Sequence, residues 1–455
     1  MTEILAAAET AVKLALKKGF NEAEAFATKI TRRDLIFRNT IEATKTGTVA
    51  GLSIRGIVGR KVGFFSTSSI ERPDIERAVE ESLKIARASN EDTDWKSLPR
   101  KYGKISVQKT LDKKVEQATA KDLVDEVRLA IDTVHNVASV DITRGFLLTS
   151  VMSNAIANSH GCKLERKETI AALSLAVKAG TADRKGVSNE FRVSRLWKGL
   201  ETKHVARTVA ERAVKMVDAA PVPNGKMNTV WRNDAFAGVV DAMLTRTITA
   251  DAVQKNRSPW VGKIGEAVAS EAVTIIDDGK MVAGNGTRQF DDDGIPQERT
   301  TVIEKGILRG FLYDNYTASK ENHPSTGNAH RDVGLFSSSP SYMKTPAPYP
   351  NNLIVEPGDV SPEDVIKEIR NGLYVVETIG EWLSNPISGE LSATLTSGFL
   401  IENGELTRAV KSGILTSNFF DVLKSKMGLR ANDLRSVGPV YAPTTQINDM
   451  TVAGE

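Results

Sequence analysis

Three short segments in the second half of the chain share one pattern, in which a two-residue turn separates two runs of apolar or β-branched residues. The segments are residues 273–284, 301–311 and 398–410, and their turns are Asp278-Gly279, Lys305-Gly306 and Asn403-Gly404. A type I′ turn needs positive φ at both central residues, which explains why Gly recurs beside Asp or Asn. Lys305-Gly306 fits this preference least well. Hairpins at such spacing predict a mainly antiparallel sheet or barrel.

The first half has a different pattern, in which helices alternate with groups of strands. The first helix is predicted over residues 2–18, with Thr2 as its N-cap and Gly19 at its end. Further helices are predicted at 74–88, 120–136 and 201–218, and strands at 22–30, 33–43, 47–67, 138–157 and 163–179. The order helix–strands–helix therefore occurs twice. It predicts an α+β domain with helices packed on one face of an antiparallel sheet.

A chain of 455 residues is too long for one ordinary core. The pattern changes after the Pro-rich joint at 221–225, so we predict an N-terminal α+β domain at 1–220 and a C-terminal, mainly antiparallel β-sheet or barrel domain at 221–455. Only short helices interrupt the second domain, near 361–370 and 419–426 and at its start.

The opening helix of the second domain lies within WRNDAFAGVVDAMLTR, residues 231–246. Asn233 or Asp234 is expected to cap its start. Its apolar residues recur at helical spacing and predict a buried stripe; they are Phe236, Val239, Val240 and Met243.

Charge and cysteine content exclude several classes of protein. Lys and Arg number 60 against 57 Asp and Glu, which argues against broad nucleic-acid binding because that requires a strongly basic face. No run approaches the roughly 18 apolar residues of a membrane span. Cys162 is the single cysteine, so no internal disulfide forms and a cytoplasmic location is predicted. His160 shares a strand face with Cys162, but residues two apart seldom meet in nucleophile–base geometry.

The usual catalytic motifs are absent from the sequence, including the GxSxG elbow, the P-loop and the dinucleotide-binding glycine pattern. No two of the five histidines have the i, i+4 spacing that lets one helix face hold zinc. The strongest acidic cluster is Asp291, Asp292 and Asp293. Because adjacent carboxylates repel, we expect it in solvent or around a cation, with Asp293-Gly294 forming a turn. His323 and His330 share one loop and could join these acids at a metal site, although polar loop residues are the favoured interpretation.

Several of these segments together resemble the TldD/PmbA family. They are GEAVASEAVTIIDDGKM (265–281), FDDDGIPQERTTVIEKGILRGFLYDNYTA (290–318), STGNAHR (325–331), GLYVVETIGEW with SGELS (372–392), GFLIENGELTRAV (398–410) and the closing NDMTVAGE. GFNEAEAF and NSHG in the first half extend the resemblance over nearly the whole chain. Each motif alone has modest specificity, whereas their order and spacing are specific.

The resemblance also indicates which type of member this is. TldD-type members carry a His-Glu-x-x-x-His helix ahead of the pair that matches Gly265-Glu266, and a Cys near the C-terminus completes their zinc site. The corresponding positions here are Asp241, Ala242, Met243 and, for the Cys, Val437. The chain therefore resembles the TldE/PmbA type, which implies no catalytic residue, metal ligand or cofactor of its own. Zinc is expected in a TldD-type partner.

What the resemblance implies is a non-catalytic subunit of a heteromeric TldD/TldE-type zinc metallopeptidase, which is cytoplasmic and processes small unfolded peptides. The alternative is a homodimeric peptide-binding or regulatory protein, in keeping with the family's older label, modulator of DNA gyrase. A third interpretation is a peptidase that uses His323 and His330 with the acidic cluster. Candidate peptide contacts, chosen from the density of family-like motifs, are Asp291, Asp292, Asp293, His330, Gly380 and Glu381.

Overall fold

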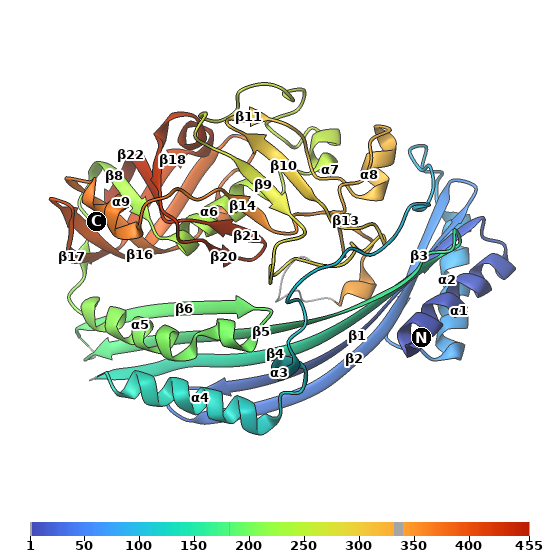
Figure 1. Cartoon of the computed structure of the whole chain (residues 1–455), viewed down its shortest axis with the longest axis horizontal. Helices are drawn as coiled ribbons and strands as arrows, with labels where there is room; N and C mark the ends of the chain where they lie inside the picture. The colour runs from blue at the N-terminus through green and yellow to red at the C-terminus, as the bar shows by residue number, and fades with distance from the viewer. Residues whose placement is uncertain (1, 138, 182, 332–339, 455) are drawn as a thin grey trace.

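The computed structural model describes residues 2–137, 139–181, 183–331 and 340–454. Within them, the first half is built on one long, curved, six-stranded sheet (Figure 1). In spatial order its strands are β3 (Lys61–Thr67), β2 (Ile41–Val58), β1 (Glu22–Phe37), β4 (Val140–Asn158), β5 (Lys163–Gly180) and β6 (Lys185–Ser194). All neighbouring pairs are antiparallel, which confirms the predicted α+β class for this half.

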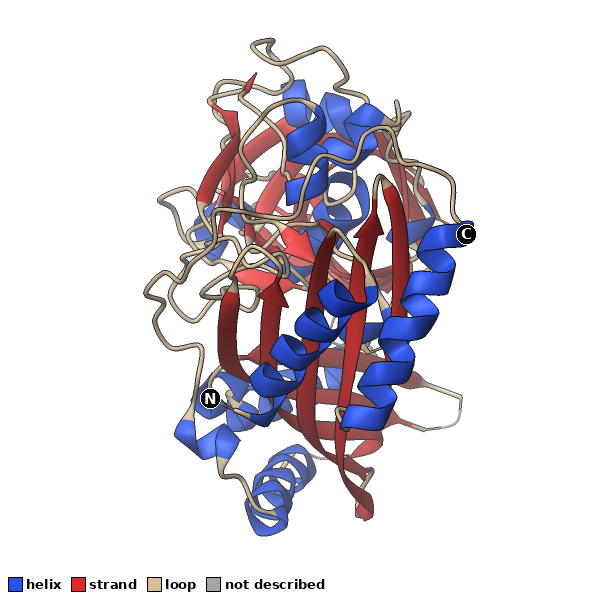
Figure 2. Cartoon of the chain, turned by 90° about the vertical axis from the view of Figure 1, so that its right-hand side faces the viewer, coloured by secondary structure: helices blue, strands red, loops and turns tan. Residues whose placement is uncertain are grey.

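Amphipathic helices cover the convex face of the sheet, as Figure 2 shows from the side. At one end lie α1 (Glu3–Lys18) and α2 (Arg72–Ala88), and at the other α4 (Ala120–His135) and α5 (Thr202–Lys215), with the short α3 (Lys113–Glu116) nearby. The predicted limits of the first helix are confirmed. The Thr2 side chain accepts a hydrogen bond from the backbone N–H of Leu5, and Gly19 ends the helix at φ 103°.

The strand boundaries predicted in the first third of the chain are partly wrong. β1 runs unbroken through Arg32 and Arg33, the turn to the next strand falls at residues 38–40, and Gly47 lies inside β2. These strands are long and paired along most of their length, so backbone hydrogen bonds carry the strands through polar and Gly positions that resemble turns in the sequence. Strand β6 was not predicted.

The second half contains a closed five-stranded barrel. Its strands, in order around the ring, are β15 (Asn371–Ile379), β8 (Gly225–Trp231), β22 (Thr445–Gly454), β18 (Gly413–Asn418) and β16 (Glu390–Glu402), and β16 pairs back with β15. Strands β17 (Glu405–Lys411) and β7 (Ala220–Pro221) extend it at one side, and β19 (Met427–Arg430) pairs with β22. The predicted barrel is thereby confirmed.

A second sheet packs beside the barrel. Its strands are β11 (Ile307–Leu308), β10 (Arg299–Glu304), β9 (Ile275–Asp278), β14 (Leu353–Val355), β21 (Val440–Ala442) and β20 (Arg435–Val437). Helix α6 (Asn233–Leu244) shares one apolar core with both. The remaining short elements are α7 (Ala250–Gln254), β12 (Ala329–His330), β13 (Ala347–Pro348), α8 (Asn315–Lys320), α9 (Pro362–Lys367) and α10 (Phe419–Asp421). No helix in the described residues has the length and apolar character needed to cross a membrane.

Of the three predicted hairpins, two are present. Lys305-Gly306 and Asn403-Gly404 join β10 to β11 and β16 to β17, each with positive φ at both central residues. The prediction at Asp278-Gly279 is wrong, although it matches the turn preference better than Lys305-Gly306. Strand β9 ends at Asp278 and pairs with β10 and β14 instead. Local turn preference is thus outweighed by which strands can bury their apolar faces together.

The concave face of the first sheet is covered by the second half of the chain (Figure 1). Phe26 of β1 and Ile156 of β4 pack there against Cys162, Phe290 and Tyr342, which form a small apolar cluster between the two halves. The helices cover the convex face and the second half covers the concave face, so the first sheet is buried on both faces over much of its length.

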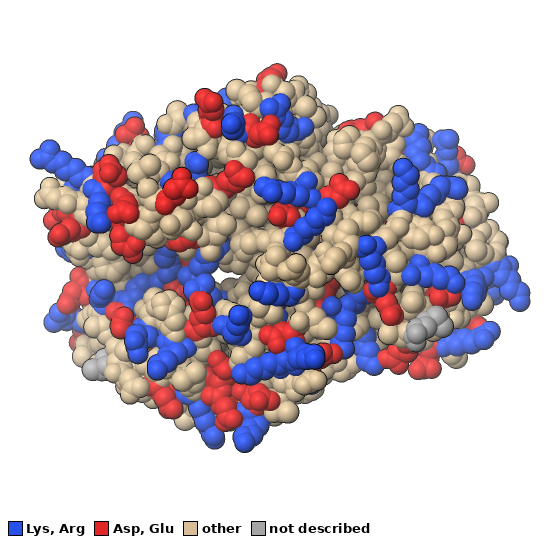
Figure 3. Space-filling model, viewed as in Figure 1, with Lys and Arg blue, Asp and Glu red and all other residues tan. Residues whose placement is uncertain are grey.

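Figure 3 shows basic and acidic side chains interspersed over one side of the molecule, with an opening between the halves.

Candidate functional site

Helix α6 is held between the barrel and the second sheet, as its amphipathic pattern predicts. Phe236, Val239, Val240 and Met243 are all fully buried in the shared core. The predicted capping is wrong. The helix starts at Asn233, so its N-cap residue is Arg232, whose side chain makes no capping hydrogen bond. The predicted residues still bind free N–H groups of the first turn: Asn233 Oδ1 accepts from the backbone N–H of Asp234 at 2.8 Å, and Asp234 Oδ1 accepts from that of Ala235 at 3.0 Å. Asp234 also forms ion pairs with arginines.

The polar side of α6 faces the turn between β20 and β21. A Cβ atom placed on Gly438 would lie 3.9 Å from Oδ2 of Asp241, and Val437 packs against the same core as the helix. The two positions that the resemblance matches to ligand sites therefore lie close together in space, although nearly 200 residues separate Asp241 from Val437 in sequence.

Glu381 approaches α6 from the loop that follows strand β15. Gly380 precedes it at φ 90°, in the left-handed region that favours Gly. A Cβ atom on Gly238 of α6 would lie 3.4 Å from Oε1 of Glu381. Gly238 thus leaves room for this carboxylate against the helix, one turn before Asp241.

Asp241 and Glu381 are both poorly solvated and incompletely paired. Burial raises the pKa of Asp241 to about 6, and the charge of Glu381 adds to this shift. Burial also raises the pKa of Glu381. One oxygen of each side chain, Oδ1 of Asp241 and Oε2 of Glu381, is buried without a hydrogen-bond partner among the described residues. The site therefore favours a proton or a cationic group near these carboxylates.

The acidic triplet lies elsewhere, between the two halves of the chain. Asp291, Asp292 and Asp293 are each at most 2% exposed, so the expectation that they sit in solvent is wrong. Asp291 accepts hydrogen bonds from the backbone N–H groups of Asp293, Ile295 and Ala329. These bonds form the predicted turn and bury its first carboxylate.

The cations that surround the other two carboxylates are arginines of the first sheet together with Arg288 of the second half, which lies 3.5 Å from Asp292. Arg166 of β5 pairs with Asp292, and Arg55 of β2 lies 3.0 Å from Asp293. Arg166 therefore holds the pKa of Asp292 well below its usual range, although burial opposes this. Burial and the charge of Asp293 raise the pKa of Asp291. In this conformation the triplet is engaged within the chain.

His330 belongs to the same buried region, whereas His323 does not. Nε2 of His330 lies 2.9 Å from Oδ1 of Asn351, and burial together with the charge of Arg288 lowers its pKa to about 3, so the ring is neutral. His323 is exposed and stacks on Tyr313 at 4.4 Å between ring centroids. Within the described ranges no three His, Cys, Asp or Glu side chains gather as a metal site would require. The third interpretation gains no geometric support.

Family models account for nearly all of the chain. The PmbA/TldA metallopeptidase C-terminal domain matches residues 224–454, the central domain 104–217 and domain 1 residues 23–86. The chain belongs to the PmbA/TldD family. The family models separate at 217–224, close to the predicted joint between the two halves.

Known members of the PmbA/TldD family resemble the chain over most of its length. A metalloprotease of Methanocaldococcus jannaschii is 26% identical, with 84% of this chain and 83% of the relative aligned. The metalloprotease PmbA homolog of Haemophilus influenzae is 23% identical over 99% and 96%. The crystal structure of TldE from Thermococcus kodakarensis superposes with a TM-score of 0.89 at 24% identity, covering 98% of this chain and all of that one, and shows the shared fold.

The relatives' description as metalloproteases raises the question of zinc. Catalytic zinc sites use three protein ligands drawn from His, carboxylate and Cys. At α6 this PmbA/TldD chain offers the carboxylates of Asp241 and Glu381, while Ala242, Met243 and Val437 have no side chain suited to zinc. The residues present therefore do not fit such an ion.

Sequence reasoning missed the buried charges of the concave sheet face. Glu24, Arg55 and Arg166 are at most 6% exposed and pair with one another, with the acidic triplet or with Arg331 of the second half. The sequence pattern that could have indicated these buried charges is the alternation of charged and small residues along the strands, as in the EAEAF stretch at 22–26. Such alternation usually indicates a solvated strand face.

Proposed function

We propose that this chain is the non-catalytic, TldE/PmbA-type subunit of a heteromeric zinc metallopeptidase that acts in the cytoplasm on small unfolded peptides. In this assembly a TldD-type partner supplies the zinc ion and the hydrolytic step. The observation that supports it most is at helix α6, where Asp241 lies beside Gly438 and the preceding Val437, the positions that the resemblance matches to an imidazole and a thiolate being Asp241 and Val437. The scaffold is that of the family, and the ligand chemistry has been replaced.

Among the candidate peptide contacts, Gly380 and Glu381 are the ones this proposal retains. They lie in the loop after β15, where Trp382 and Leu383 are 62% and 80% exposed. The acidic triplet and His330 are buried and paired at the junction of the two halves, so the proposal gives them a structural part there. Contact of a peptide with Gly380 and Glu381, or with the acidic triplet and His330, is a prediction.

The test is reconstitution with a TldD-type chain that carries the His-Glu-x-x-x-His motif. Size-exclusion chromatography with light scattering should give a complex containing both chains, with zinc measured by mass spectrometry at one ion per TldD-type chain. An unstructured peptide should be cleaved by the complex. A partner with the Glu of its motif changed to Gln is the matched control, because it should assemble without cleaving.

Two outcomes would contradict the proposal. If this chain alone binds one zinc ion or cleaves the peptide, it is itself the enzyme. If it forms a homodimer and never associates with a TldD-type chain, the homodimeric alternative holds.

A further inference from the structure

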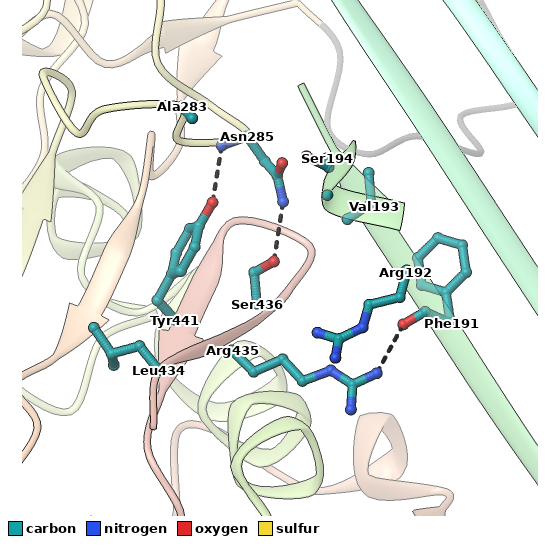
Figure 4. A pocket seen from close by; sticks show the side chains of 11 residues that line it. Phe191, Arg192, Val193, Ser194, Ala283, Asn285, Leu434, Arg435, Ser436 and Tyr441 are labelled. Atoms are coloured by element: carbon teal, nitrogen blue, oxygen red, sulfur yellow. Dashed lines mark hydrogen bonds between the residues drawn. The ribbon is translucent and has the colours of Figure 1, made fainter. Parts of the chain in front are cut away.

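A cavity of about 190 Å³ lies where the end of β6 meets the β20–β21 hairpin. Six polar side chains line it: Arg192, Ser194, Asn285, Arg435, Ser436 and Tyr441 (Figure 4). The cavity is several times larger than the roughly 30 Å³ share of one water molecule, so it has room for a small polar group together with part of the residue that carries it.

Most of these groups are fixed by contacts within the chain. The backbone N–H of Asn285 donates to the Tyr441 hydroxyl at 2.9 Å, and its side-chain amide donates to Ser436 Oγ at 3.0 Å. Arg435 donates to the carbonyl of Phe191 and pairs with Glu190. The walls are therefore rigid and preorganised for a ligand.

Arg192 is the exception, because its guanidinium lacks a full set of partners. Its one ion pair in the described residues is to Glu201 at 3.1 Å, and the Glu201 side chain is 52% exposed, which weakens the pair. Nε of Arg192 is buried, and the described residues give it no hydrogen-bond partner. Figure 4 shows this guanidinium beside that of Arg435 at the cavity. A planar guanidinium with donors to spare is suited to bind a carboxylate at two points.

The surrounding charges are unevenly paired. Four guanidinium groups, those of Arg192, Arg212, Arg232 and Arg435, meet the carboxylates of Glu190, Asp234, Glu201 and Glu377. Glu190 pairs with Arg212, Arg232 and Arg435, and Glu377 accepts a hydrogen bond from the side-chain amide of Asn189 at 2.8 Å. Arg192 is therefore the weakly paired cation of this group, and a single weakly paired charge matches a carboxylate better than a phosphate dianion.

We propose that this cavity binds a carboxylate of the peptide substrate, with Arg192 as the principal ligand and the hydroxyl groups of Ser194 and Tyr441 as further donors. The carboxylate is either the C-terminus of the peptide or an Asp or Glu side chain. The inference rests on the proposed function for the identity of the ligand as a peptide, while the chemistry of the cavity is independent of any partner subunit.

The cavity lies close to helix α6 along the chain, so a carboxylate bound there would position the rest of the peptide relative to this helix. Arg435 and Ser436 belong to β20, and the next residues of the chain are Val437 and Gly438, which faces Asp241 on α6. Two residues of strand span about 7 Å. A carboxylate anchored at Arg192 would therefore fix an extended peptide at a set distance from α6.

Binding of three peptides to the full chain tests the proposal by isothermal titration calorimetry. All are unstructured and of the same length: one lacks Asp and Glu and has a free C-terminus, the second is the same peptide amidated, and the third is amidated with one internal Glu. At least one carboxylate peptide should bind about tenfold more tightly than the neutral one, the increment typical of one charge-assisted contact. Which of the two does so identifies the source of the carboxylate.

The variant Arg192→Gln should abolish this preference, whereas Arg192→Lys should retain part of it. Arg184→Gln is the matched control, because Arg184 also pairs with an exposed acid, Asp218, but lies away from the cavity lining. Circular dichroism verifies that each variant folds. Equal affinity for all three peptides, no binding of any peptide at millimolar concentration, or an unchanged preference in Arg192→Gln would overturn the proposal. Since no partner is present, failure of heteromer assembly is a separate result.

Discussion

Asp241 shows how a buried, incompletely paired carboxylate can carry a cost in stability. Its carboxylate has one buried oxygen without a partner, and its pKa rises from 3.8 to about 6 in the folded chain. The folded state therefore holds a proton that the unfolded state releases between these two values. The contribution of Asp241 to the free energy of unfolding therefore falls as the pH rises from about 4 to 6, and this decrease is complete above pH 6.

Replacing the carboxylate by its neutral isostere should remove that loss. We expect Asp241→Asn to raise the free energy of unfolding by about 1–2 kcal/mol at pH 8, less than the full shift implies because the side chain is partly solvated. At pH 4 the gain should be small. Urea unfolding at both pH values measures it. Asp251→Asn on α7 removes an exposed acid that pairs with Lys255, so this control should give no gain in stability at pH 8; equal effects of Asp241→Asn at the two pH values would contradict the assignment.

At the scale of elements, glycines set how closely helices approach the first sheet. Gly63 of β3 lies directly under α2, where an added Cβ would overlap the backbone carbonyl of Ser82 and lie 2.8 Å from the backbone nitrogen of Ala86. Neither backbone atom can move without shifting the helix. A single methyl group would therefore disturb the packing of α2, which is buried against the sheet through Ile75, Ala78 and Val79.

Gly63→Ala should accordingly lower the free energy of unfolding by about 1–3 kcal/mol, the usual cost of overpacking. Guanidinium unfolding followed by circular dichroism gives the value. Gly47→Ala is the matched control, because Gly47 lies within β2 with nothing within 4 Å of its added Cβ. The control should be neutral. A Gly63→Ala variant as stable as the control would show that α2 is not fixed at this contact.

Amphipathic periodicity was enough to predict α1, α2, α4, α5 and α6, since each helix buries one stripe. Strand ends were predicted less well, because in long paired strands the neighbour supplies hydrogen bonds through residues such as Gly47 that resemble turns. At the site, family motifs identified Asp241 and Val437, and the structure places them together. The sequence indicates Glu381 only as part of a family-like motif, and it does not indicate Arg192. The chemistry of Arg192 depends on neighbours that are far away in sequence.

At the scale of the whole molecule, the two halves are joined by buried charges as well as apolar contacts. Arg55 of β2 lies 2.9 Å from Glu24 and 3.0 Å from Asp293, and Glu24 also pairs with Arg331. All four side chains are at most 7% exposed. The sequence could not predict this, because a charged strand face is buried only when another part of the chain supplies the opposite charges and covers it.

Removing one member of such a network leaves the others buried without compensation. We expect Arg55→Met to lower the free energy of unfolding by about 3–5 kcal/mol, since Glu24 and Asp293 would each lose a partner. Arg32→Met on β1 is the control. Arg32 pairs with Asp34 at a 43% exposed position, and its loss should cost about 1 kcal/mol or less.

The position of the Arg55–Asp293 ion pair also leads to a prediction about the cooperativity of unfolding. Because Arg55 and Asp293 belong to different halves of the chain, Arg55→Met should weaken the junction more than either half. Differential scanning calorimetry should then resolve two transitions, or one broadened transition, where the Arg32→Met control keeps the shape of the parent. If Arg55→Met shifts a single sharp transition without broadening it, the halves unfold as one unit, held by the contacts that remain, such as the apolar cluster of Phe26 and Ile156 and the ion pair of Glu24 with Arg331.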